Sequence, residues 1–303
     1  MNGRRLGGPI AAATLLAMAV VIAWVVVEST QDLPLVTWIG TLPFAVIFAA
    51  AAVFWVLFAL VAWWIAERAL DQAARDRTQE NVSRILIIVS TFFVFVLGFV
   101  ISQEWSNANA ARNDVSRGAA AIYTAGYNAY PLPRSSIVEI QASLDELSRS
   151  IVCREIPALE ETGKGAPQTG MALADSFKVA TDQPRSVQEM VTFDNIVGAL
   201  GTVSEARREW LTEAASGLPD VVLIAIVILG MTLVATFAVQ ATVSRRGHVA
   251  TVIVLALLVA LGTSLAVSLA RPFAGAAQVS AETLTQGAGT SQAIEDCGRP
   301  AQR

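Results

Sequence analysis

Long uncharged apolar runs alternate with polar stretches along this chain. The run at residues 85–101 carries no charge, and Ser90 and Thr91 are its only polar side chains. At about 1.5 Å per residue it forms roughly 25 Å of helix, which is at the short end for a membrane span. No proline follows until Pro131. The pattern therefore predicts one long helix, from residue 85 to about residue 130, that leaves the bilayer and enters an aqueous domain.

Four further apolar runs are also predicted to cross the membrane, at residues 9–27, 43–66, 221–243 and 248–270. A cleaved signal peptide is the alternative for the first run, but no A-x-A cleavage site follows it. Trp63 and Trp64 end the second run, as is common for aromatic residues at a membrane interface. The predicted fold is all-α and multi-pass, with five transmembrane helices and a small helical extramembrane domain between the third and fourth.

Polar residues divide the chain into five regions. These are two spans with an arginine-rich loop (1–84), the third span (85–103), the helical extramembrane domain (104–218), a two-span hairpin (219–270) and a tail (271–303). The polar end of the first region, residues 67–84, is interpreted as a helical linker on the membrane surface.

Two S-x-x-E capping boxes mark helix starts inside the extramembrane domain. Ser136–Glu139 is expected to begin a helix that Pro157 ends, and Ser186–Glu189 is expected to begin another. Residues 158–185 are rich in glycine, threonine and proline and are expected to form a loop. Three amphipathic helices of this length predict a small bundle without an obvious large core, completed by a neighbouring subunit.

Composition agrees with a membrane protein and excludes several kinds of site. Hydrophobic residues make up 54% and charged residues 15% of the chain, against about 45–50% and about 25% in soluble proteins. The net charge of −4 gives no reason to expect a nucleic-acid partner. With one histidine and two cysteines, a His-rich or Cys-rich metal site cannot form within one chain. No catalytic, cofactor-binding or metal-binding residue is assigned, and enzyme activity is not expected.

The distribution of arginine predicts the orientation. Arginines occur near the N-terminus, in the loop at 67–84 and in the turn at 244–247, whereas the loop at 28–41 has no lysine or arginine. Positive loops stay in the cytoplasm, so the N-terminus is expected inside and residues 104–218 and the tail outside. Cys153 and Cys297 then both face the oxidising side. A disulfide between them is one expectation, and two unrelated thiols are the other.

Ile88, Phe92, Phe95 and Phe99 lie on one face of the third span. As a candidate pore face, they would ring the neck of an oligomeric pore and gate it by dewetting. The alternative is a face that contacts lipid or packs against other helices. No charged residue lies in the middle of any predicted span, which argues against a pump or an ion-coupled transporter.

An acidic group, Glu155, Glu160 and Glu161, lies near Cys153. No metal-ligand spacing is visible there. The group is expected to be solvated surface.

Two segments resemble the bacterial bestrophin-like domain family, a domain of unknown function that has been compared with bestrophin anion channels. They are GFVISQEWSNANAARNDVSRGAAAIYTAGYNAYPLP and SLARPFAGAAQVSAETL. The second contains the family's exit motif at Arg271, Pro272, Phe273 and Gly275, although Ala270 replaces the aspartate often found before it. The resemblance covers roughly residues 85–285 and implies an oligomeric anion channel, since true bestrophins are pentameric. Arg271 itself is expected to anchor at lipid headgroups, to pair with an acidic residue, or to bind an anion.

Three functions follow from these patterns. The first is an oligomeric bestrophin-like anion channel or pore. The second is a membrane-anchored interaction or scaffolding protein without transport, and the third is a sensor subunit that needs a partner for its output. The expected partners are the lipid bilayer and further copies of the chain. The arginine-rich, alanine-rich composition suggests a bacterial protein of the cell membrane.

Overall fold

The structure is a computed structural model that describes residues 42–70, 72–182, 186–215, 217–240, 244–274 and 297. Every regular element in these ranges is helical. The helices belong to two compact units. The apolar unit contains the described residues up to Glu104 and Leu218–Leu269. The polar unit contains Trp105–Gly217 and the described residues from Ala270 onward.

Four described helices are long and apolar enough to cross a membrane. They are α3 (Phe44–Ala69), α4 (Gln72–Asn128), α9 (Asp220–Val239) and α10 (Arg245–Leu269). They include the second to fifth predicted spans, while the predicted span at 9–27 lies outside the described residues. The predicted long helix is present as α4, but it begins at Gln72 rather than at residue 85. The polar connection therefore supplies the first turns of α4.

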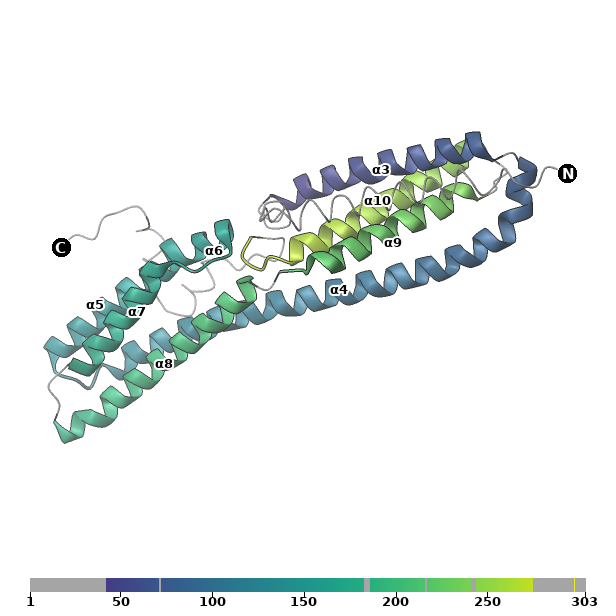
Figure 1. The fold of residues 1–303 in the computed structure, drawn as a ribbon. Coiled ribbons are helices and arrows are strands. Elements are labelled where there is room, and N and C mark those ends of the chain that lie inside the picture. The colour runs from purple at the N-terminus through teal and green to yellow at the C-terminus, as the bar shows by residue number, and fades with distance from the viewer. Residues whose placement is uncertain are drawn as a thin grey trace. The chain divides into compact units, whose positions relative to one another are not determined.

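Small residues let α3, α9 and α10 pack side by side in the apolar unit (Figure 1). The Trp55 ring of α3 is 2% exposed, and its indole nitrogen donates a hydrogen bond to Thr263 Oγ1 on α10 at 3.3 Å. A Cβ at Gly230 of α9 would lie 2.7 Å from this ring. Glycine is thus needed where α9 meets Trp55. By contrast, a Cβ added at Gly98 of α4 would have no neighbour within 4 Å.

The polar unit has a substantial core, contrary to the sequence expectation. Its helices are the second half of α4, α5 (Arg134–Ser150), the π-helix η1 (Ile151–Glu155), α6 (Ile156–Thr162), α7 (Pro167–Asp182) and α8 (Val187–Ala215). Phe193, Leu200 and Trp210 of α8 are each at most 1% exposed within this core. Many other core residues are alanines, which a search for large apolar side chains does not detect.

Helix α7 replaces most of the loop expected at 158–185. Apart from Leu173, its buried residues are small or short: Thr169, Ala172, Ser176 and Ala180. This spacing of three or four residues follows one helix face. Pro167 suits the first turn because its missing N–H needs no partner there. The glycines and threonines that suggested a loop are therefore compatible with a tightly packed helix.

The predicted capping box at Ser136–Glu139 does not begin a helix. Helix α5 begins at Arg134 after Pro133, and Ser136 lies buried inside it. Pro157 does not end this helical segment either, because the chain continues through η1 into α6. A proline nitrogen cannot donate the usual helical hydrogen bond. The wider π-helix η1 ends at Glu155, two residues before Pro157.

The second capping box is confirmed. The Ser186 amide donates to Glu189 Oε2 at 2.8 Å, and the Glu189 amide donates to Ser186 Oγ at 3.3 Å. These reciprocal bonds satisfy amides at the start of α8.

Candidate functional site

The candidate pore face lies on α4 within the apolar unit. Its four residues, Ile88, Phe92, Phe95 and Phe99, are 54–70% exposed. Phe93 and Val100, on the other side of the helix, are each 5% exposed. Leu97 also packs inward, because a Cβ on Gly262 of α10 would collide with it. The helix therefore packs through one side. The candidate pore face, called the phenylalanine stripe below, is not covered by the described part of the chain.

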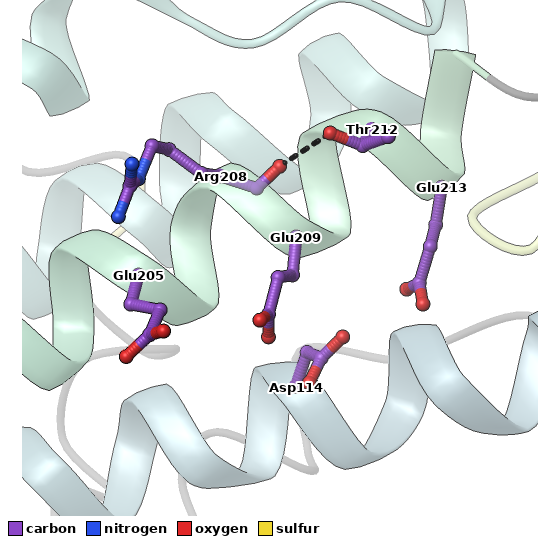
Figure 2. Close-up of a pocket in the computed structure, with 6 residues that line it drawn as sticks. All are labelled: Asp114, Glu205, Arg208, Glu209, Thr212 and Glu213. Carbon is purple, nitrogen blue, oxygen red and sulfur yellow. Dashed lines mark hydrogen bonds between the residues drawn. The ribbon is translucent and has the colours of Figure 1, made fainter.

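The polar unit contains a cavity of about 470 Å³ between α4 and α8. Figure 2 shows Glu205, Glu209 and Glu213 projecting from α8 toward Asp114 of α4. The spacing of four residues places the three glutamates on one face of α8. Arg208 and Thr212 complete the lining, and Thr212 Oγ1 donates to the Arg208 carbonyl at 2.8 Å.

Arg117 of α4 links the carboxylates on both walls of this cavity. Its Nη2 lies 2.9 Å from Asp114 Oδ1 and also contacts Glu209 Oε2. Glu213 lies further along the wall, within electrostatic reach of Asp114. Burial, reinforced by the negative charge of Asp114, raises the pKa of Glu213 to about 7, while Arg117 opposes the shift. The Glu213 carboxyl can therefore take up a proton near neutral pH.

The cavity does not have the features of a metal site. Within the described ranges, no group of three or more His, Cys, Asp or Glu residues is arranged to hold a metal ion. The chemistry available to its carboxyls is proton exchange and ion pairing with arginine.

A second charged cluster joins η1, the residue before α7 and helix α8. Glu155 is fully buried, although the sequence pattern suggested solvated surface. Arg207 Nε donates to its Oε1 at 2.8 Å and Nη2 to its Oε2 at 3.2 Å. The Ala166 amide also donates to Glu155 Oε2 at 2.7 Å. A Cβ at Gly165 would lie 2.6 Å from Leu211, so glycine lets the loop approach this ion pair.

Cys153 and Cys297 form a disulfide in the structure, with their Cα atoms 5.3 Å apart. Cys153 belongs to the π-helix η1 and packs against the core of the polar unit. The bond attaches a position near the end of the chain to this helix. Glu155 lies two residues after Cys153, and its partner Arg207 is on α8.

The exit motif after α10 is folded into the polar unit. Phe273 is 2% exposed and belongs to its core, and Arg271 is 8% exposed. A Cβ on Gly163 would lie 3.5 Å from Arg271 Nη2, and Gly163 has a φ of 68°. Burial lowers the pKa of Arg271. These observations correct the expectation that Arg271 anchors at lipid headgroups. Pro272 is described, whereas Gly275 lies outside the described residues.

The structure does not gather all the predicted residues into one site. The phenylalanine stripe belongs to the apolar unit, and the disulfide and exit motif belong to the polar unit. The sequence analysis did not identify the carboxylates of the cavity. The repeat of Glu205, Glu209 and Glu213 is visible in the sequence, but nothing in the sequence connects it with Asp114, which is distant along the chain.

The family model of the Bestrophin-like domain matches residues 53–284. No curated protein and no solved structure matches the chain.

Proposed function

Because the chain belongs to the bestrophin-like domain family, we propose that this membrane protein assembles into an oligomeric anion channel. The observation that carries the proposal is the uncovered phenylalanine stripe on α4, opposite the side through which that helix packs. In a symmetric ring, each subunit presents the same stripe to the axis. Stripes from several copies would then form a hydrophobic constriction.

The stripe has the length and chemistry that a hydrophobic gate requires. From Ile88 to Phe99 it extends roughly 16 Å along the helix at about 1.5 Å per residue. Aromatic rings in a narrow neck expel water, and ions do not cross until the neck widens and is wetted. Selection among ions would then belong to polar groups outside the constriction, and the resemblance to bestrophins makes chloride the first ion to test.

The lack of charge in the spans supports a channel over an ion-coupled transporter. No Asp, Glu, Lys or Arg lies in the middle of α3, α9, α10 or the apolar half of α4. Proton relays and coupled transport normally use such groups. The arginine distribution further supports an N-terminus in the cytoplasm, with the polar unit on the outer side.

Chloride flux in liposomes containing the full-length protein tests the proposal. We expect flux above that of protein-free liposomes and a further increase for the triple variant Phe92→Ala, Phe95→Ala, Phe99→Ala. The matched control is Ile87→Ala, Val94→Ala, because these residues are 66% and 65% exposed on the same helix but lie off the stripe. Wild-type flux equal to the protein-free value, or a monomeric mass in detergent, would contradict the channel.

A membrane-anchored interaction protein is the second candidate, favoured by exposed aromatic residues on the polar unit. Tyr123, Tyr127 and Tyr130 are 56–66% exposed. The rings of Tyr127 and Tyr130 contact each other, with centroids 6.2 Å apart. Tyrosine is enriched in protein–protein interfaces. A monomer without flux would favour this function over the channel.

A further inference from the structure

Arginine and tryptophan side chains gather at one end of the apolar unit. The guanidinium carbon of Arg68 lies 4.1 Å from the centroid of the Trp64 ring, and that of Arg245 lies 5.0 Å from the Trp63 ring. Both tryptophans are near the end of α3, and Arg245 is the first residue of α10. The two cation–π contacts therefore bring the last turns of α3 to the start of α10 (Figure 1).

This end of the unit has an excess of positive charge. Two of its acidic residues form ion pairs: Glu67 Oε1 lies 2.9 Å from Arg75 Nη1, and Glu80 Oε1 lies 2.6 Å from Arg84 Nη2. Asp76 is the other described carboxylate at this end. Four further arginines are exposed at the same end, Arg68, Arg77, Arg245 and Arg246. The start of α10 adds to this positive potential, because amides in the first turn of a helix lack intrahelical acceptors.

One face of α3 changes from apolar to aromatic to cationic toward this end. Leu57 and Val61 are 57% and 54% exposed, and Trp64 is 49% exposed. Arg68 follows one turn later, so the four residues lie on one helix face. The order matches the depth profile of a phospholipid, in which acyl chains meet apolar side chains, the interface meets tryptophan, and the phosphate meets a cation.

We propose that the cluster formed by Trp63, Trp64, Arg68, Arg245 and Arg246 binds the phosphate headgroup of an anionic phospholipid. Guanidinium groups bind phosphate oxygens in bidentate geometry, and the cation–π contacts hold two of these arginines in place. The exposed Leu57 and Val61 extend the site toward the acyl chains, which makes a phospholipid a better ligand than free phosphate. The site does not depend on channel activity.

Binding of lipid to purified full-length protein in neutral detergent tests the site. Native mass spectrometry and thermal unfolding would compare phosphatidylglycerol, phosphatidylcholine and inorganic phosphate. We expect phosphatidylglycerol to bind and to raise Tm, and the other two to have little effect. The variant Arg245→Gln, Arg246→Gln should weaken phosphatidylglycerol binding about thirtyfold, since each arginine near an anionic surface contributes about a factor of five. Arg68→Gln should weaken it about fivefold.

The matched control is Arg77→Gln, Arg84→Gln, which removes the same charge from exposed positions of α4 outside the cluster. Unchanged elution volume and helical circular dichroism establish that each variant is folded. Equal losses in the control and the cluster variant would overturn the site in favour of diffuse electrostatic attraction. Equal stabilisation by inorganic phosphate would overturn the lipid as ligand, and undiminished phosphatidylglycerol binding by the cluster variants would overturn the proposal as a whole.

Discussion

Arg207 holds the fully buried carboxylate of Glu155 through two hydrogen bonds, at 2.8 and 3.2 Å. Removal of either partner leaves a charge without compensation inside the polar unit. Arg207→Met is therefore expected to lower the free energy of unfolding by about 3–5 kcal/mol. Thermal or denaturant unfolding of the full-length protein in detergent measures the change.

The control for this prediction is Arg84→Gln, which breaks an ion pair whose side chains are 71% and 78% exposed. Exposed pairs contribute little, so no measurable change in stability is expected. Similar losses in Arg207→Met and Arg84→Gln would contradict a special role for the buried pair.

Gly230 is required by the packing of α9 against Trp55. A Cβ there would lie 2.7 Å from the Trp55 ring and 3.1 Å from Val259. Gly230→Ala is expected to destabilise the protein by about 1–3 kcal/mol through overpacking. Gly98→Ala, with nothing within 4 Å of the added atom, is the matched variant and should change Tm little. Equal Tm values for the two variants would be inconsistent with this packing.

The raised pKa of Glu213 predicts a pH dependence of stability. The pKa of Glu213 is about 7 in the folded protein against a reference of 4.5. Between these values the folded protein holds a proton that the unfolded chain releases, so stability falls as pH rises from about 4.5 to about 7 and then levels off. The effect should be on the order of 1 kcal/mol, well below that of a fully buried carboxyl, because the group is partly solvated.

Glu213→Gln removes this titration and should flatten the profile of Tm against pH. It should also raise Tm above that of the wild type at pH 8, where Glu213 of the wild type is ionised in a partly buried position. Glu160→Gln, on α6 and outside the cavity, is the control. An unchanged slope between pH 5 and pH 7 in Glu213→Gln would argue against a proton on Glu213 in this range.

The Cys153–Cys297 disulfide closes a loop with a sequence separation of 144 residues. Long loops lose more entropy when a bridge constrains the unfolded chain, and a loss of about 2–4 kcal/mol is expected for Cys153→Ser. Thiol labelling of the unreduced protein should find no reactive cysteine, and reduction should expose two and alter gel mobility. Two thiols that label without reductant would rule the bond out under those conditions.

Sequence patterns predicted the spans well because the bilayer imposes a simple requirement. A span needs a continuous apolar run of sufficient length, and each run from Phe44 onward coincides with a helix of the structure. The reciprocal cap at Ser186 and Glu189 was also predictable, since its partners are three residues apart. The similar motif at Ser136 does not cap a helix. Ser136 is buried inside α5, where tertiary packing outweighs the local preference of serine for a helix start.

The sequence by itself determined that this is an all-α membrane protein of the bestrophin-like family, through the length of its apolar runs and its exit motif. Only the tertiary structure decided that Glu155 is buried against Arg207 and that Asp114 faces Glu213. It also decided that two arginines contact tryptophan rings at one end of the spans. These relationships depend on which helix faces meet, and most of them join residues far apart along the chain. The phenylalanine stripe lies opposite the packed side of α4, and no described residue of the chain covers it.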